Sequence, residues 1–260
     1  MNDVLPAGRR VGRRAVLAGL AGAAAVPWAR PAAACAAGTV VFRDGFETGT
    51  FDAWDVESVE GNGTQAVVPD PAGSGELVAR FTLPNDGVSF RSELGKDQFE
   101  WGRYVYQLSI FVPADWVVFE RGSILAQWHG YRFADGTSTY PPLALNAYQN
   151  LWRLDLARLT GPNTATKQFF TLGSLSGSYG RWTKWVFDIT WSTPDSDGLV
   201  VITRDGTEVL REAGANNYHQ QWSPHFQTGI YRSEWRPGNS WPTGGPDVVV
   251  CHRDIVVTEY

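Results

Sequence analysis

Lysine, cysteine and long apolar runs are scarce in this chain of 260 residues. Its only lysines are Lys96, Lys167 and Lys184, and the formal net charge of −5 argues against a nucleic-acid binder, which would carry a basic face. No apolar run reaches the ~18 residues that a transmembrane helix requires. The hydrophobic fraction of 43%, with 12 Trp residues, excludes a disordered chain because it supplies enough apolar surface for a core. We therefore expect a globular protein with no nucleic-acid partner and no membrane span.

Metal and cofactor motifs are also missing. The two cysteines, Cys35 and Cys251, form no C-x-x-C motif, and the histidines lack the tight spacing of zinc ligands: His129, His219, His225 and His252. No Walker, dinucleotide-binding or nucleophile-elbow motif occurs in a supporting context. A structural calcium ion is possible, although the spacing of the acidic residues gives no indication of one. The sequence therefore predicts a protein that needs neither metal nor cofactor.

Residues 1–37 have the layout of a secretory signal peptide. Four arginines between residues 9 and 14 precede a short apolar stretch over residues 15–26, and small residues follow up to residue 37. Residues 12–17 resemble a twin-arginine signal, which exports folded proteins; an ordinary secretory signal with extra arginines is the alternative. Removal of residues 1–37 takes away five arginines and one aspartate, so the formal charge changes from −5 to −9. We expect an acidic, secreted, extracellular protein.

The two cysteines have several fates in an exported protein. In an oxidising compartment, Cys35 and Cys251 could form a disulfide that joins the terminal strands. Cys35 could instead be lipidated, although the leucine usual at the third position before a lipoprotein cysteine is absent. It could also leave with the signal peptide. The sequence leaves these alternatives open.

Residues 38–260 show the pattern of β-strands. Between residues 181 and 191, Trp185, Phe187 and Ile189 alternate with polar residues, so one face of this strand belongs to a core and the other is solvated. Similar segments recur, and Asp205-Gly206 predicts a hairpin turn. The further predicted strands are 39–43, 76–83, 88–94, 103–112, 123–129, 143–148, 151–158, 199–204, 226–232 and 247–258. No repeat or linker divides this region, which predicts an all-β fold: one jelly-roll sandwich of two antiparallel sheets with a concave substrate cleft.

Three of these strands place polar residues on a common face, because residues i and i+2 of a strand point the same way. The pairs are Arg91 with Glu93, Gln127 with His129, and Gln227 with Tyr231. The alternation puts Ile124 and Trp128 on the opposite face from Gln127. Gly229, between Gln227 and Tyr231, suggests a close approach to the backbone by a ligand. Taken singly, each pair also fits a structural role, such as a surface ion pair or a hydrogen-bonded core histidine.

Together the three segments carry a family resemblance. Arg91-Ser92-Glu93-Leu94, Gln127-Trp128-His129 and Gly229-Ile230-Tyr231, in this order, resemble the signature strands of the jelly-roll polysaccharide lyases. These include alginate lyases, heparin lyase I and glucuronan lyases. The segments 42–47 and 127–143 are most similar to the branch of glucuronan lyases and heparin lyase I. The resemblance covers most of residues 39–258.

The resemblance implies β-elimination in a uronic-acid polysaccharide, with roles for specific residues. It makes His129 and Tyr231 catalytic, Gln127 the group that neutralises the uronate carboxylate, and Arg91 a subsite arginine. The family's lysine two residues before the glycine is Gln227 here, which weighs against sulfated substrates. Further substrate-binding residues are expected around this set: Glu93, Gln227, His225, Tyr140 and Arg232. Aromatic residues in loop-like segments are candidates for stacking on sugars: Tyr131, Tyr140, Tyr148, Trp222, Trp235 and Trp241.

The chemistry of elimination explains why such residues are needed. Removal of the C5 proton beside a carboxylate builds up negative charge, and one preorganised donor to that carboxylate is worth ~3 kcal/mol. In a glucuronate unit the C5 hydrogen and O4 lie on the same side. Tyr231 could then act as acid and base if cations such as Arg91 stabilise its phenolate, with His129 as base or neutraliser. In a guluronate unit they lie on opposite sides, which suits His129 as base and Tyr231 as acid.

Two other functions compete with a lyase. A non-catalytic carbohydrate-binding jelly roll needs cleft aromatics but no reactive His129 and Tyr231. A retaining glycoside hydrolase would show a Glu-x-Asp-x-x-Glu strand, which this chain lacks. A net charge of −9 repels a polyanion at long range, so binding must rely on local cations and aromatic residues. The sequence therefore favours a monomeric enzyme whose partner is a sparsely charged acidic polysaccharide such as a glucuronan.

Overall fold

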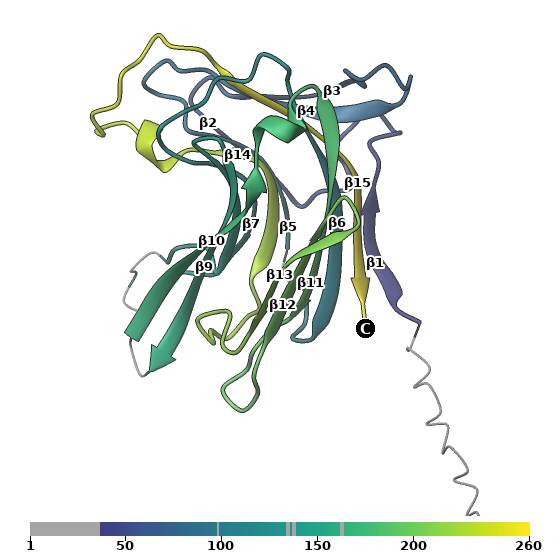
Figure 1. The fold of residues 1–260 in the computed structure, drawn as a ribbon, viewed down its shortest axis with the longest axis vertical. Helices are drawn as coiled ribbons and strands as arrows, with labels where there is room; N and C mark the ends of the chain where they lie inside the picture. Colours follow the sequence, from purple (N-terminus) through teal and green to yellow (C-terminus); the bar gives the residue numbers. More distant parts are fainter. Residues whose placement is uncertain (1–36, 98, 134–135, 137–138, 162–163) are drawn as a thin grey trace, which may run out of the picture. The chain divides into compact units, whose positions relative to one another are not determined.

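Two antiparallel β-sheets pack face to face in the computed structural model of the chain (Figure 1). The structure describes residues 37–260, except residues 98, 134–135, 137–138 and 162–163. Within these residues there is no α-helix, and two 3-10 turns lie at Ser176–Ser178 and Ser233–Trp235. None of the described helical turns is long and apolar enough to cross a membrane. The prediction of an all-β sandwich is confirmed.

The larger sheet has eight strands in the order β13-β12-β11-β6-β15-β4-β3, and β1 pairs with β15. Its members are β1 (Thr39–Asp44), β3 (Thr64–Pro69), β4 (Leu77–Leu83), β6 (Arg103–Val112), β11 (Arg181–Thr190), β12 (Leu199–Arg204), β13 (Thr207–Ala213) and β15 (Val248–Glu259). This sheet brings both ends of the described chain together, because Thr39 is paired with Glu259.

The smaller sheet has seven strands in the order β10-β9-β8-β7-β14-β5-β2. Its members are β2 (Val56–Glu60), β5 (Arg91–Lys96), β7 (Ser123–His129), β8 (Leu143–Tyr148), β9 (Leu151–Gly161), β10 (Thr164–Ser174) and β14 (His225–Tyr231). The three strands that carry the predicted polar pairs, β5, β7 and β14, are direct neighbours. They come from segments far apart in the sequence, so the fold itself assembles the site.

The core lies between the sheets and follows the alternation of the sequence. Trp185, Phe187 and Ile189 of β11 are fully buried in it, whereas Lys184 faces solvent. The predicted hairpin turn joins β12 to β13, with positive φ at Asp205 (49°) and Gly206 (83°). Two-residue turns of this handedness match the twist of the flanking strands, which explains the preference for Asp-Gly.

Irregularities in two strands correct the predicted side-chain directions. The pairing of β7 with β8 shifts register between Ile124 and Ala126, so Leu125 and Ala126 both lie in the core and Ile124 faces the cleft. The prediction that Ile124 and Trp128 share a face is therefore wrong, because a bulge reverses the alternation. The pairing of β14 with β7 also shifts, between Thr228 and Tyr231.

Gly229 lies at this shift, with φ of +132°. A Cβ atom there would lie 2.3 Å from the carbonyl oxygen of Ser92 and 2.8 Å from Cα of Glu93. The close neighbour of Gly229 is thus the backbone of β5 and not a ligand, as the sequence had suggested. The glycine allows β5 to approach β14 at the middle of the site.

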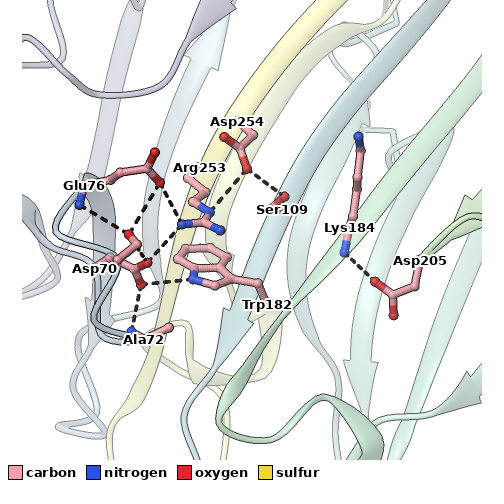
Figure 2. Close-up of polar contacts among 10 residues, drawn as sticks. Asp70, Ala72, Glu76, Ser109, Trp182, Lys184, Asp205, Arg253 and Asp254 are labelled. Carbon is pink, nitrogen blue, oxygen red and sulfur yellow. Dashed lines mark hydrogen bonds and ion pairs between the residues drawn. The ribbon is translucent and has the colours of Figure 1, made fainter.

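A polar cluster fixes the β3–β4 turn on the outer face of the eight-stranded sheet (Figure 2). Asp70 accepts hydrogen bonds from the backbone of Ala72 (2.8 Å), the indole of Trp182 (3.0 Å) and the guanidinium of Arg253 (2.9 Å). Arg253 also lies over the Trp182 ring at 4.4 Å and contacts Glu76 at 3.1 Å. These groups satisfy one another, which identifies the cluster as structural.

Two predictions concern residues outside the described part of the chain. The signal peptide falls almost entirely in residues 1–36, and Cys35 lies there too, so export and the Cys35–Cys251 disulfide stay predictions. Cys251 itself is buried in β15, and this burial raises the pKa of its thiol to about 11.

Candidate active site

A cleft of about 1040 Å³ crosses the smaller sheet on the face opposite the core. Each of the seven strands of this sheet contributes at least one lining side chain. The residues from these strands are Glu60, Arg91, Ile124, His129, Asn146, Tyr148, Arg153, Asp155, Lys167, Phe169, His225, Gln227 and Tyr231. A cleft that spans every strand suits an extended polymer better than a small ligand.

Strand β14 brings the predicted catalytic residues together at the centre of the cleft. Its pairing places His225 opposite His129 of β7, and Tyr231 opposite Arg91 of β5. All four side chains line the cleft, and so does Gln227. The sequence predicts that Arg91, Gln127, His129 and Tyr231 converge in one cleft; Arg91, His129 and Tyr231 line it, whereas Gln127 does not.

His129 is held in the form that a general base requires. Its Nδ1 lies 2.6 Å from the carbonyl oxygen of Gly130, and because a carbonyl can only accept, Nδ1 carries the proton. Burial, and secondarily the charge of Arg91, lowers the pKa of His129 below its ordinary value of 6.5. The imidazole is thus neutral at pH 7, with the lone pair on Nε2. In this form Nε2 accepts protons and cannot donate to a carboxylate.

The His225 side chain lies beside His129 on the cleft surface. The two ring centroids are 5.7 Å apart, and Tyr131 lies 5.4 Å from His225 on another side. Burial, followed by the charges of His129 and Arg91, lowers the pKa of His225 to about 4. His225 therefore presents an uncharged aromatic surface at neutral pH.

Arg91 connects Tyr231 to the buried part of the site. Its guanidinium lies over the Tyr231 ring, 4.8 Å from the centroid, and its Nε lies 3.3 Å from Oε2 of Glu93. Phe90 packs edge-on against Tyr231 from the cleft side, at 6.4 Å between centroids. A cation fixed in this way can pair with the carboxylate of a bound ligand.

Glu93 and Gln127 lie beneath the cleft floor. Glu93 is fully buried, Gln127 is 1% exposed, and neither lines the cleft. The Gln127 Nε2 donates a hydrogen bond of 2.6 Å to Oε1 of Glu93. Burial raises the pKa of Glu93 to about 7, against the opposing effects of Arg91 and Gln127. In place of the predicted substrate contact, this arrangement gives Glu93 a positioning role, since it anchors Arg91 and Gln127 from below.

Arg232 requires a further correction. It was expected to bind substrate, but it is fully buried and does not line the cleft. Its guanidinium lies between the rings of Phe119 (4.4 Å) and Trp235 (4.3 Å) and donates to the hydroxyl of Ser123. Because neighbouring residues of a strand point to opposite faces, Tyr231 enters the cleft and Arg232 enters the core side.

The predicted stacking aromatics divide into two groups. Tyr131, Tyr140 and Tyr148 line the cleft, whereas Trp222, Trp235 and Trp241 do not. The sequence analysis missed other lining residues, which include aromatic, cationic and amide side chains: Phe90, Phe169, Arg121, Arg132, Arg153, Lys167, Arg236 and Asn146. The alternation Lys167-x-Phe169, next to Arg153-x-Asp155 on the neighbouring strand with Phe169 opposite Asp155, is the signal that could have revealed part of this set.

The lining carries more positive than negative charge. Its cations are Arg91, Arg121, Arg132, Arg153, Lys167 and Arg236, and its carboxylates are Glu60, Asp155 and Glu234. Such a cleft attracts an anionic polymer locally although the whole chain is acidic. In the described part of the chain, no group of three or more His, Cys, Asp or Glu side chains could hold a metal ion.

Comparisons with known proteins agree with this geometry. The family model described as polysaccharide lyase matches residues 46–251. Among solved structures, an endo-β-1,4-glucuronan lyase from the fungus Trichoderma reesei is similar at 20% identity and a TM-score of 0.72, with 85% of this chain and 96% of that chain covered. An alginate lyase from a Chlorella virus is similar at 12% identity and a TM-score of 0.55, with coverage of 85% and 100%.

A third structure, an alginate lyase from Pseudomonas aeruginosa, shows 14% identity and a TM-score of 0.51, with coverage of 75% and 86%. No curated protein sequence matches the chain. At these identities the solved structures establish the fold, a lyase jelly roll, while the family model covers most of the chain. The protein therefore belongs to the polysaccharide lyase family.

Proposed function

We propose that the protein is an exported lyase that cleaves a glucuronan-like uronic-acid polysaccharide by β-elimination. The observation that carries this proposal is the convergence of Arg91, His129, Gln227 and Tyr231 in one cleft of the smaller sheet. A non-catalytic binding module would not need a histidine held in its neutral, Nδ1-protonated form beside a tyrosine and an arginine. The likeness to the fungal glucuronan lyase supports the choice of substrate.

The first requirement is neutralisation of the substrate carboxylate. Arg91 supplies a fixed cation, and Gln227 supplies an amide that lines the cleft where related lyases carry a lysine. The resemblance gave this role to Gln127, but its amide nitrogen donates to the buried Glu93. We therefore assign the carboxylate contact to Arg91 and Gln227, and a supporting role to Gln127.

Proton transfer follows from the states of His129 and Tyr231. His129 Nε2 takes the proton from C5, the C5–H electron pair forms the C4=C5 double bond, and the C4–O4 bond breaks. Tyr231 donates its hydroxyl proton to the leaving O4. The proton on His129 then returns to the Tyr231 phenolate through solvent, and both groups are restored.

The position of the two groups favours a glucuronate unit. His129 and Tyr231 come from adjacent strands of the same sheet and rise from one cleft floor, so both reach a bound sugar from the same side. In glucuronate the C5 hydrogen and O4 also lie on one side, whereas in guluronate they lie on opposite sides. From the sequence, His129 as base with Tyr231 as acid fitted a guluronate unit; because both residues lie on one face of the same sheet, we now assign this pair to a glucuronate unit. The cleft geometry thus supports glucuronan over guluronate-rich alginate.

The test uses a panel of uronate polymers and measures the ultraviolet absorbance of the unsaturated product. Wild-type protein is expected to release this product from glucuronan, and Tyr231→Phe to reduce kcat by at least about 1000-fold, since the acid is lost. Tyr260→Phe, at an exposed tyrosine outside the cleft, is the matched control and is expected to behave as wild type. An unchanged rate for Tyr231→Phe would contradict the assignment, and binding without any product would identify a carbohydrate-binding module.

A further inference from the structure

A second organised group of side chains lies in the same cleft, away from Tyr231. It comprises Tyr140, before β8, together with Arg153 of β9 and Lys167 and Phe169 of β10. Tyr140 is 64% exposed and Phe169 is 55% exposed. Two aromatic rings that remain this open to solvent inside a cleft contribute little to the fold, so they are available to a ligand.

The cations of this group are held rigidly between aromatic rings. The Lys167 ammonium lies 4.5 Å from the Tyr140 ring centroid and 5.2 Å from that of Phe169. The Arg153 guanidinium lies between Tyr148 at 3.8 Å and Phe169 at 4.6 Å. Cation–π contacts of this kind fix the charged groups in place before any ligand arrives.

One buried carboxylate, Asp155, orients both cations. Arg153 donates two hydrogen bonds to it, of 2.7 and 3.1 Å, and Lys167 lies 3.1 Å from Oδ2. Asp155 is 4% exposed, so it faces the two cations and not the solvent. The cluster therefore keeps a net positive charge, displayed between flat apolar rings.

This combination fits one chemical class of ligand. Aromatic faces stack on the apolar faces of sugar rings, and a fixed cation pairs with a carboxylate on the same ring. In the sheet order, Lys167 and Phe169 on β10 lie four strand spacings from Tyr231 on β14 and three from His129 on β7, or ~19 and ~14 Å along the sheet. Arg153 on β9 is one spacing nearer to both. The cluster is thus out of reach of the sugar unit that is cleaved.

We propose that Tyr140, Lys167 and Phe169 form a distal subsite that binds a second uronate unit of the same polymer, several sugar units from the scissile bond. This inference rests on the proposed lyase function and extends it. It makes activity dependent on chain length: only a chain long enough to reach the β10 side of the cleft gains this binding energy. The subsite adds affinity without touching the reacting atoms.

The test compares Lys167→Met and Tyr140→Ala with wild type on a long polymer and on the shortest cleavable oligomer. For the polymer, each variant is expected to raise KM about tenfold with kcat unchanged, because uniform binding is lost. For the shortest oligomer, both constants are expected to stay at wild-type values. Lys184→Met, which removes a lysine on the outer face of the other sheet, is the matched control and is expected to behave as wild type.

The outcomes separate the two proposals. A fall in kcat on the shortest oligomer, or an unchanged KM on the polymer, would overturn the distal subsite while the lyase function stands. If wild-type protein releases no unsaturated product, the lyase function falls. The subsite is then tested by calorimetric titration with uronate oligomers of increasing length. The distal subsite is supported if long oligomers bind more tightly than short ones and Lys167→Met abolishes this difference. Binding that does not depend on oligomer length overturns it.

Discussion

Replacement of Glu93 by Gln is expected to change how the stability of the protein depends on pH. Glu93 is fully buried, and this burial raises the pKa of its carboxyl group from 4.5 to about 7. In the unfolded chain the carboxyl titrates at its ordinary value. Between the two values the folded state keeps a proton that the unfolded state has lost, so stability falls as the pH rises. Below 4.5 and above about 7 this contribution is constant.

The size of the effect follows from the same two values. The slope is about 1.4 kcal/mol per pH unit within the window, and integration from pH 5 to pH 8 gives a loss of roughly 2–3 kcal/mol. Glutamine does not titrate, so Glu93→Gln escapes this loss. The lowered pKa values of His129, His225 and His252 act in the opposite direction at acidic pH, but they are common to both proteins. They cancel to first order when the two proteins are compared.

The assay is urea unfolding followed by tryptophan fluorescence at several values between pH 5 and pH 8. The unfolding free energy of Glu93→Gln relative to wild type is expected to rise by roughly 2–3 kcal/mol across this range. The control is Glu60→Gln, at an exposed glutamate of the cleft rim, whose difference from wild type is expected to vary much less. A constant difference between Glu93→Gln and wild type at pH 5 and pH 8 would refute the reasoning.

Two further predictions concern the base and the backbone of β14. Burial lowers the pKa of His129, and a general base works in its neutral form, so the acid limb of the pH profile of kcat/KM is expected to have its midpoint below pH 6.5. NMR titration of the imidazole checks that this limb belongs to His129. A midpoint above pH 6.5 would contradict the assignment. Gly229→Ala is expected to destabilise the protein by at least about 2 kcal/mol in thermal or urea unfolding, since its Cβ meets the β5 backbone. Gly206→Ala, also at positive φ but with no atom near its Cβ, is expected to cost less, and equal costs would exclude the close approach as the cause.

The sequence was sufficient for the strands that carry the central residues. Alternating apolar residues mark β7, β11 and β14, and the polar pairs on β5, β7 and β14 predict a shared face. The assembly of these strands into one site came from the family resemblance, because no local pattern states that β14 lies between β5 and β7. The sheet order is a long-range property, set by packing of the whole sandwich.

A β-bulge in β7 and the burial of two polar residues below the cleft floor account for most errors in the predicted side-chain positions. A register shift in β7 reverses Ile124 and Leu125, and a period-2 pattern cannot show where such a shift occurs. The alternation of residues along β5 and β7 assigns Glu93 and Gln127 to the cleft face. It does not show that both side chains are buried beneath the cleft floor. Arg232, expected to bind substrate, lies instead on the side opposite Tyr231, where its guanidinium contacts Trp235.

The distal part of the cleft escaped prediction for a different reason. Most residues of strand β10 are polar and exposed, so no alternation of apolar and polar residues marks this segment as a strand. The role of Lys167 on this strand is recognised only from its ion pair with Asp155 on the neighbouring strand, a carboxylate that also binds Arg153. A polar strand at the edge of a concave sheet is recognised from its partners and not from its own sequence.

The distribution of charge bears on the proposal that this acidic protein binds an acidic polymer. Its formal charge is −5 for the whole chain and −9 without residues 1–37, so long-range attraction cannot bring a polyanion to it. The cleft nevertheless holds six cationic side chains against three carboxylates, and one of these, Asp155, already pairs with Arg153 and Lys167. Salt screens exposed charges beyond about 8–10 Å, so these local cations act on the bound polymer at short range while the surrounding acidity is damped. If the proposed lyase function holds, weak repulsion outside the cleft also favours release of a shortened anionic product, which contacts fewer of these cations than the intact polymer does.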